Sequence, residues 1–145
     1  MSDVTCDVKV AVVIQEMVQS EISGVAFTVH PVTKDRNQMI IEAVWGLGEA
    51  LVSGQVTPDS YVVGKRERAL LDISGNEQER MLAKAGWTAA HKSQAKKQKL
   101  DSKQILELAE LCLGIEKHYG FPCDIEWAFV KGKFWVTQSR PITTL

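Results

Sequence analysis

Short valine-rich stretches, separated by polar and glycine-containing breaks, make up the first half of the chain. Residues 8–18 form a nearly continuous apolar run bounded by polar residues, which predicts a buried strand. The same kind of pattern predicts further strands at residues 24–29, 39–44 and 60–63. Residues 70–73 predict one more strand, which pairs with the strand at 60–63. Together these stretches predict a sheet.

A glycine-rich segment follows the strand at 39–44. Gly46, Gly48 and Gly54 indicate a loop, and the residues between them predict one short helical turn at Glu49–Val52. The spacing falls short of a dinucleotide-binding fingerprint, because Leu51 stands in the place of the third glycine, and the chain has no Walker lysine motif. A Rossmann or P-loop site is therefore a poor interpretation.

The clearest helix signal begins near residue 101. Asp101 or Ser102 can cap its first turn, and Gly120 with Pro122 ends it. Apolar residues recur along one face of this helix: Ile105, Leu108, Ala109, Leu111, Cys112 and Ile115. Helices do not alternate regularly with the strands, which favours an α+β domain, an antiparallel sheet with flanking helices, over a doubly wound sheet.

Residues 76–100 lose the regular apolar spacing and carry several lysines: Lys84, Lys92, Lys96, Lys97 and Lys99. Such a cluster can form a basic patch for an anionic partner. A solvated loop or an exposed helix is the interpretation we favour, because no interleaved aromatic residues or repeat accompany the charges. We treat residues 65–100 as a variable, partly exposed insertion.

The last third of the chain predicts two antiparallel strands, residues 124–130 and 134–140, that form a ribbon. A three-residue loop at 131–133, with Gly132 in a left-handed conformation, would join them. One face of this ribbon carries large apolar residues that can anchor it on a core: Ile125, Trp127, Phe129 and Trp135. The other face is polar and would point into a cleft.

On that polar face, the three-residue loop places Glu126 opposite Gln138 and Asp124 opposite Arg140. A two-residue loop would slip the pairing by one and put Glu126 and Gln138 on opposite faces. Carboxylate and amide oxygens suit Mg²⁺, and the planar guanidinium of Arg140 suits phosphate. The same residues also fit a surface hairpin with a weak Asp124–Arg140 ion pair.

Several motifs resemble one enzyme family. D-I-E-W-A at 124–128 and Q-S-R-P-I-T-T-L at 138–145 resemble the end of the ATP-binding domain of the phosphoenolpyruvate synthase and pyruvate phosphate dikinase family. V-I-Q-E-M-V with S-G-V-A-F-T, and E-A-V-W-G-L-G-E with V-S-G-Q-V-T-P-D-S-Y, resemble the same family in the same order. The resemblance implies that residues 1–145 form a single domain, the carboxy-terminal lobe of an ATP-grasp domain.

The resemblance also implies ATP and Mg²⁺ as cofactors and gives roles to individual residues. Glu126, Gln138 and Arg140 would be catalytic, the first two as metal ligands and Arg140 as a contact of the polyphosphate. Asp124 would support the site as a cofactor-binding residue. The end of the first apolar run would be a hinge at the adenine: Gln15, Glu16, Met17 and Val18. From the residues alone, the first two of these are simply the polar end of a strand. Glu49 would have a weaker supporting role.

For the parent enzyme, the resemblance implies phosphoryl or pyrophosphoryl transfer from ATP to a carrier histidine on another domain, and then to pyruvate. The alternatives are the ATP-binding lobe of a rifampicin phosphotransferase-like enzyme and a non-enzymatic nucleotide-binding module. The expected partners are an amino-terminal ATP-grasp lobe, a phosphohistidine domain and a pyruvate-binding domain, in cis or as separate chains. The isolated chain is then expected to be inactive, as a cloned domain, a truncated gene product or a split-enzyme subunit. None of His30, His91 and His118 is a candidate for the carrier.

Composition excludes some classes of partner and location. The chain has 145 residues, 45% of them hydrophobic, and a formal net charge of −1, so no basic excess suggests a nucleic-acid partner. Its apolar stretches are shorter than a membrane span and its first residues lack a secretory signal, so we expect a cytoplasmic protein. Cys6, Cys112 and Cys123 predict reduced thiols. Without a partner lobe, the apolar floor of the cleft is expected to favour self-association.

Overall fold

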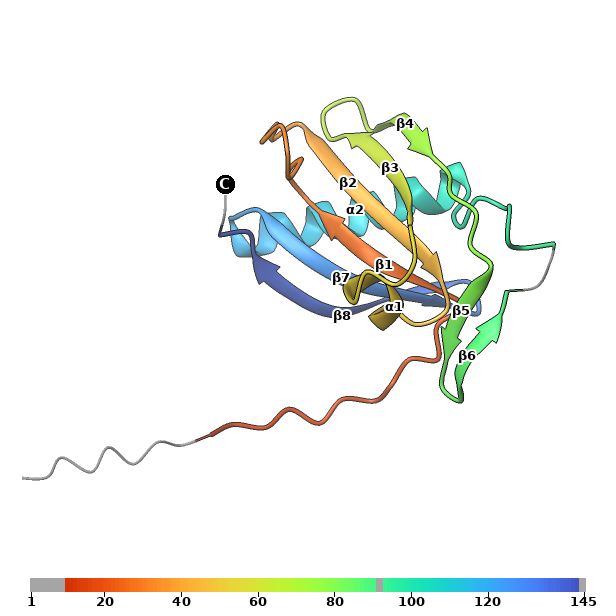
Figure 1. Cartoon of the computed structure of the whole chain (residues 1–145). Helices are drawn as coiled ribbons and strands as arrows, with labels where there is room; N and C mark the ends of the chain where they lie inside the picture. Colours follow the sequence, from red (N-terminus) through yellow and green to blue (C-terminus); the bar gives the residue numbers. More distant parts are fainter. Residues whose placement is uncertain (1–9, 91–92, 144–145) are drawn as a thin grey trace, which may run out of the picture.

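The computed structural model describes residues 10–90 and 93–143, and its main feature is an antiparallel sheet of six strands in the order β4-β3-β2-β1-β7-β8 (Figure 1). The strands run as follows: β1 Ile22–Phe27, β2 Gln38–Trp45, β3 Asp59–Gly64, β4 Ala69–Ser74, β7 Cys123–Val130 and β8 Lys133–Pro141. The strands predicted from the sequence after residue 20 are confirmed, with small differences at their ends. So is the short helix α1 (Glu49–Val52).

The long helix α2 (Ser102–Tyr119) packs against one face of the sheet (Figure 1). Its start is fixed by a capping box, in which Asp101 accepts a hydrogen bond from the Gln104 amide at 2.8 Å and the Gln104 side chain accepts one from the Asp101 amide at 2.9 Å. Gly120 ends the helix in a left-handed conformation, with φ 77°. The predicted helix is therefore confirmed at both ends.

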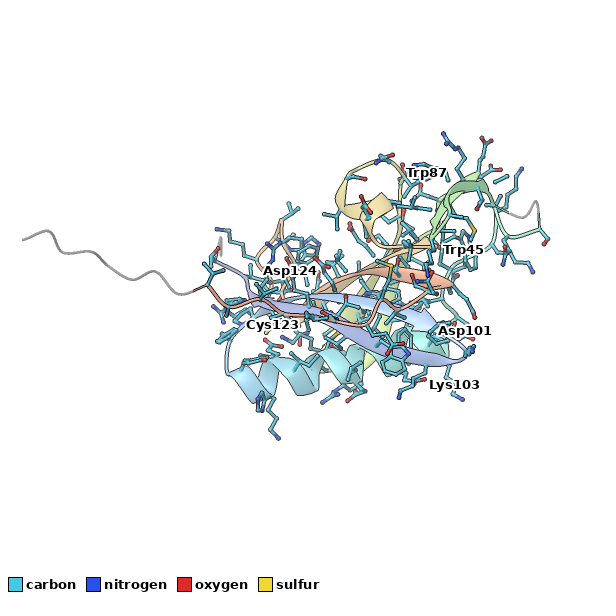
Figure 2. The ribbon with its side chains drawn as sticks, turned by 90° about the horizontal axis from the view of Figure 1, so that it is seen from below. Trp45, Trp87, Asp101, Lys103, Cys123 and Asp124 are labelled. Carbon is cyan, nitrogen blue, oxygen red and sulfur yellow. The ribbon has the colours of Figure 1, made fainter. Side chains whose placement is uncertain are left out.

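The core lies between α2 and the sheet. From the helix it takes Ile105, Leu108, Ala109 and Cys112, and its largest fully buried side chains include Trp127, Tyr61, Met39 and Ile41. Leu111, which we expected in the apolar stripe, is 39% exposed. It lies roughly 120° around the helix from Ile105, because each residue turns the helix by about 100°. Figure 2 shows α2 on one side of the sheet, with α1 and a small hairpin on the other.

This small hairpin consists of β5 (Arg80–Ala83) and β6 (Gly86–Ala89), and it forms a separate two-stranded sheet. The prediction of a solvated loop or exposed helix for residues 76–100 is wrong at this point. It is also wrong for the end of the segment, since Lys99 is buried. Sequence patterns missed the hairpin because its strands are only four residues long and have little apolar alternation.

Lys99 is buried because it pairs with Asp59 at the start of β3. The Lys99 Nζ lies 2.8 Å from Asp59 Oδ1, and both side chains are fully buried. Asp59 also accepts hydrogen bonds from the Lys99 amide at 2.9 Å, the Asn76 amide at 2.7 Å and the Tyr61 hydroxyl at 2.9 Å. Burial is the largest cause that raises the pKa of Tyr61. This cluster joins both ends of the 76–100 segment to the sheet.

The segment before β1 is where the sequence pattern misleads most. Residues 10–18, the described part of the predicted strand at 8–18, belong to no strand, and their apolar side chains are largely exposed: Val10, Val12, Val13, Ile14 and Met17, at 66–96%. A strand with apolar residues on both faces needs a covering layer on each side. Here the sheet ends at β8, and the segment does not join it as a further strand (Figure 1).

Two further sequence predictions concern thiols and membranes. Cys112 and Cys123 are free, as predicted, and both are buried, while Cys6 lies outside the described residues. Burial raises the pKa of the Cys112 thiol to about 12. Within residues 10–90 and 93–143, no helix has both the length and the apolar character needed to cross a membrane.

Candidate functional site

In the β7–β8 ribbon Glu126 faces Gln138 as predicted, but the loop that joins the two strands differs from the prediction. Its loop has two residues, Lys131 and Gly132, with φ 51° and 75°, and Val130 pairs directly with Lys133. The predicted three-residue loop is therefore wrong. Two successive positive φ values are typical of a tight hairpin turn that matches the twist of its strands.

A β-bulge compensates for the short loop. Trp127 pairs with Val136 but Glu126 pairs with Gln138, which leaves Thr137 as an extra residue in β8. Glu126 therefore faces Gln138, and the predicted partner pairs along this part of the ribbon are confirmed. Our expectation that a two-residue loop separates these side chains is wrong, because it assumed an unbroken ladder.

The short loop also changes which aromatic residue anchors the ribbon. Ile125, Trp127 and Phe129 are buried as predicted, but Trp135 is 44% exposed because it pairs with Ala128 on the polar face. Phe134 takes its place in the core, with its ring centroid 4.7 Å from that of Phe129. The slip of one residue before the bulge explains the exchange.

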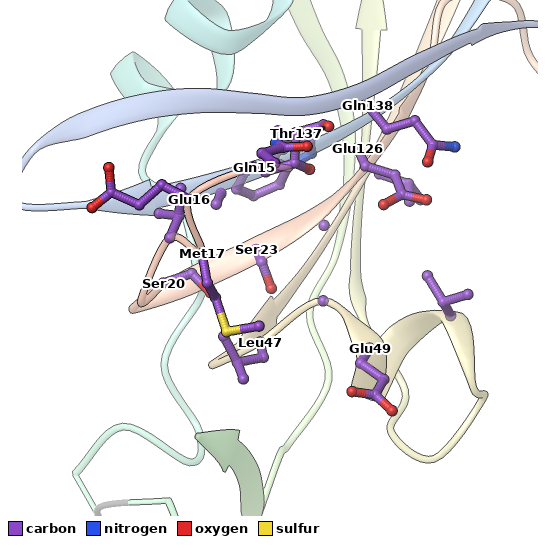
Figure 3. A pocket seen from close by; sticks show the side chains of 17 residues that line it. Gln15, Glu16, Met17, Ser20, Ser23, Leu47, Glu49, Glu126, Thr137 and Gln138 are labelled. Carbon is purple, nitrogen blue, oxygen red and sulfur yellow. Dashed lines mark hydrogen bonds between the residues drawn. The ribbon is translucent and has the colours of Figure 1, made fainter. Parts of the chain in front are cut away.

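A cavity of about 540 Å³ lies on the face of the sheet away from α2 (Figure 3). Its lining comes from the segment before β1, the loop after β2, α1 and the β7–β8 ribbon. The side chains of Glu126 and Gln138 lie next to each other, and Glu49 on α1 lies at the opposite side of the cavity, with its carboxylate turned away from them (Figure 3). Thr137 also lines the cavity, so the bulge brings two successive residues of β8 to the same site.

The four residues expected at the adenine line this same cavity: Gln15, Glu16, Met17 and Val18. The Gln15 side-chain amide donates a hydrogen bond to the carbonyl of the bulged Thr137, at 3.3 Å. The structure therefore brings together two sequence segments about 120 residues apart, each proposed separately for the nucleotide. Their contacts with a nucleotide stay a prediction.

Asp124 and Arg140 face each other as predicted but do not line the cavity. The Arg140 Nε and Nη2 atoms lie 2.8 and 2.6 Å from Asp124 Oδ2. The Asp124 side chain is 9% exposed and that of Arg140 is 67% exposed, so a buried carboxylate orients an accessible guanidinium. The hydrogen bond to Asp124 raises the pKa of Arg140 most, followed by the charge of Asp124, and the charge of Glu126 adds to it.

Sequence reasoning missed how the glycine-rich loop is held. The hydroxyls of Ser20 and Ser23 both donate hydrogen bonds to the Gly46 carbonyl, at 2.8 and 2.6 Å. Gly48 and Glu49, just beyond, line the cavity. The available signal was the polar entry to β1, where Ser23 and Gly24 both line the cavity.

The site residues offer a specific set of chemical groups. Glu126 and Gln138 present a carboxylate and an amide group side by side, and their oxygens suit a hard cation. Within the described part of the chain, no group of three or more His, Cys, Asp or Glu side chains is placed to hold a metal ion. Arg140 offers a charged donor next along the ribbon. Together these groups suit a cation whose coordination is completed by the oxygen atoms of an anionic ligand.

Glu42 on β2 provides a test of the electrostatics of this sheet face, because it flanks Val25, whose other neighbour is Glu126. Burial raises the pKa of Glu42. The folded state therefore binds this proton more tightly than the unfolded state, and the stability it contributes at low pH is lost as the pH rises through the raised pKa. We expect Glu42→Gln to increase the free energy of unfolding near pH 7 and to change it little near pH 3.5. Urea denaturation at both pH values measures this, and an equal gain at both would contradict it.

Comparison with known proteins places the chain in a family. A family model described as the AMP/ATP-binding domain of pyruvate phosphate dikinase matches residues 3–145. The chain belongs to this family. The match supports the resemblance drawn from the sequence motifs, and it identifies the chain with the nucleotide-binding part of such enzymes.

Curated relatives of this dikinase-family chain have two kinds of name. A probable phosphoenolpyruvate synthase of Archaeoglobus fulgidus is 48% identical over 96% of the chain, and one of Methanocaldococcus jannaschii is 46% identical over 95%. A rifampicin phosphotransferase of Bacillus cereus is 44% identical over 95%. The chain spans only 19%, 12% and 16% of the lengths of these three relatives, respectively.

Proposed function

We propose that this chain is the carboxy-terminal lobe of an ATP-grasp domain and that it binds ATP with Mg²⁺ in the 540 Å³ cavity. The observation that carries the proposal is that Glu126 and Gln138 face the same cavity as residues 15–18. In this arrangement, residues 15–18 contact the adenine. The triphosphate then extends toward Glu126 and Gln138.

The donor set of the ribbon fits Mg²⁺. This ion usually takes one or two protein carboxylates and completes its octahedron with water and substrate phosphates. Glu126 and Gln138 would hold it, and when bound it would neutralise charge on the phosphates. Arg140, held by Asp124, is accessible to a phosphate and can present two parallel N–H donors. Asp124 then acts as a positioning residue for Arg140.

The reaction that we propose for the parent protein is ATP-dependent transfer to a carrier histidine on another domain, and then to pyruvate. The names of the relatives from A. fulgidus and M. jannaschii support it. This chain's share is to bind and orient the nucleotide. A rifampicin phosphotransferase-like reaction is the second candidate, favoured by the B. cereus relative, and domains beyond this lobe would choose the acceptor.

The partner domains that we propose follow from the site, because this chain would form only one of its two sides. We propose that an amino-terminal lobe covers the cavity and the exposed residues 10–17, and that a phosphohistidine domain and a pyruvate-binding domain act with it, in cis or as separate chains. Apolar patches of this kind favour association. The isolated chain should therefore self-associate, and light scattering over a concentration series would show a mass above that of the monomer.

The direct test is a Mg-ATP titration of the wild type, Arg140→Ala and Arg140→Lys, each with and without an added amino-terminal lobe. The lobe can be taken from the A. fulgidus relative. We expect weak binding and no turnover by the isolated chain in a coupled phosphoenolpyruvate assay. With the lobe, Arg140→Ala should weaken binding about 10- to 100-fold, because a charge-assisted contact is lost. Arg140→Lys should recover part of it, since lysine keeps the charge but not the fork.

Three results would contradict the proposal. Turnover by the isolated chain well above the blank would show that the chain needs no second lobe. Tight, Arg140-sensitive binding by the isolated chain would favour a non-enzymatic nucleotide-binding module. Binding that ignores both Arg140 variants would place the nucleotide elsewhere.

A further inference from the structure

The loop between β2 and α1 is held firmly at Gly46, and neither of its two anchors belongs to the nucleotide chemistry proposed above. One anchor is the start of β1: the Gly46 amide donates a hydrogen bond to the Glu21 carbonyl at 2.9 Å, and the Gly46 carbonyl accepts from Ser20 and Ser23. The other anchor is the β5–β6 hairpin, from the segment that we had expected to be exposed. Trp45, at the end of β2, and Trp87, in this hairpin, are both labelled in Figure 2.

Backbone contacts join the hairpin to the loop. Gly46 forms a parallel bridge with Leu82 of β5, and the Leu47 amide donates a hydrogen bond to the Leu82 carbonyl at 2.8 Å. A Cβ atom on Gly46 would lie 2.4 Å from the Leu82 carbonyl oxygen, and Gly46 has φ 87°. Only glycine fits this close approach without strain.

Gln78 completes the anchor with its side chain. Its Oε1 accepts a hydrogen bond from the Trp45 amide at 2.9 Å, and its Nε2 donates to the carbonyls of Trp45 at 3.0 Å and Arg80 at 2.9 Å. Gln78 is 3% exposed. Its amide group thus bonds both backbone groups of Trp45, as a neighbouring strand would. It also fixes β5 to the end of β2 through Arg80.

The residues that this anchor places have little support of their own. The helix α1 has only four residues, and Gly48 at its start provides no side-chain cap. Helices of this length are not stable in isolation. The positions of Gly48 and Glu49 at the cavity therefore depend on where Trp45, Gly46 and Leu47 are held.

We propose that Gln78 is a positioning residue that, with the β5–β6 hairpin, holds the Gly46–Glu49 loop at the phosphate end of the cavity. The proposal rests on the proposed function, since it takes the cavity to bind ATP with the phosphates near Glu126 and Gln138. Loss of Gln78 would let the loop shift. The effect should fall on the triphosphate and spare the adenine end, which the proposed function assigns to residues 15–18, part of the cavity lining.

The first experiment needs no nucleotide. Gln78→Met keeps the approximate volume of the side chain and removes its hydrogen bonds, and amide hydrogen exchange by NMR is compared with that of the wild type. We expect the Trp45 and Leu47 amides to exchange roughly 10- to 100-fold faster, because two hydrogen bonds to Trp45 are lost. Amides of β1 and β7 should not change. Thr88→Val, an exposed change on β6, is the matched control and should leave the loop unaffected.

The second experiment compares Mg-ATP with AMP, each titrated against the wild type and Gln78→Met in the presence of the amino-terminal lobe. The variant should bind Mg-ATP about tenfold more weakly and AMP as well as the wild type does. Equal weakening for both nucleotides, or Leu47 exchange at the wild-type rate, would overturn the proposal. If the wild type binds neither nucleotide, the proposed function fails, and the exchange experiment alone decides whether Gln78 holds the loop.

Discussion

Replacing Glu126 with glutamine is expected to slow ATP-dependent phosphoryl transfer about 100- to 1,000-fold when the chain works with its proposed partner domains. Glutamine keeps the shape of the side chain and one oxygen donor but removes the negative charge. Glu126 is the acidic member of the facing pair on the ribbon, and Gln138 is neutral, so the pair would have no anionic donor left. The rate of AMP formation from ATP, measured by chromatography, gives the effect.

A matched control separates loss of the site from loss of the fold. Glu21 is an exposed carboxylate beside the same hairpin, where it accepts a hydrogen bond from the Lys131 amide at 3.3 Å, and it does not line the cavity. Glu21→Gln should leave the rate within about twofold of the wild type. A Glu126→Gln enzyme that keeps wild-type activity would remove Glu126 from the chemistry. Equal losses in both variants would point to a general effect on the hairpin.

Replacing Asp59 with alanine is expected to lower the free energy of unfolding by about 3–5 kcal/mol. The substitution leaves the buried ammonium group of Lys99 with one remaining partner, the Asn76 carbonyl. It also leaves the Tyr61 hydroxyl and the Asn76 amide without their acceptor. Since domains of this size have a total stability of about 5–15 kcal/mol, this loss is large. Urea denaturation followed by far-UV circular dichroism measures it.

Removing Lys99 and removing Asp59 should lower the stability of the fold by different amounts. Lys99→Met leaves the Asp59 carboxylate with three hydrogen-bond donors, from the Lys99 amide, the Asn76 amide and the Tyr61 hydroxyl. We therefore expect Lys99→Met to destabilise the fold less than Asp59→Ala. The variant with both changes should be more stable than Asp59→Ala, because no unpaired buried charge remains. A cost below about 1 kcal/mol for Asp59→Ala would show that the cluster does not anchor the 76–100 segment.

Helix α2 was predicted correctly from local sequence signals alone. The cap at Asp101, the apolar spacing of α2 and Gly120 at its end fixed a helix without long-range information. The facing of Glu126 and Gln138 was predicted correctly for a wrong reason. An expected loop one residue too long and an unexpected bulge at Thr137 shift the register by the same amount. Trp135 lies before the bulge and shows the error, since it is exposed where burial was expected.

The remaining errors concern contacts that no local pattern contains. Residues 10–18 have the composition of a buried strand, yet burial depends on a covering layer, and the part of the chain that the structure describes provides none for them. Lys99 looked like one of several surface lysines, but its partner Asp59 lies forty residues earlier. The role of Gln78 had no sequence signal, because a side-chain amide that bonds the backbone of Trp45 has no characteristic spacing.

Paramagnetic broadening by Mn²⁺ with ATP tests most directly whether Glu126 and Gln138 bind one metal–nucleotide complex together. The spectrum of the labelled chain is recorded at low Mn²⁺ and excess ATP, with the amino-terminal lobe present, and the effect falls steeply with distance from the metal. If Glu126 and Gln138 bind the complex together, the amides of residues 126 and 138 broaden first and those of residues 48 and 49 next. Glu126→Gln then suppresses the effect. Broadening centred on other carboxylates, such as Asp35, or none at either strand of the ribbon, would contradict the site.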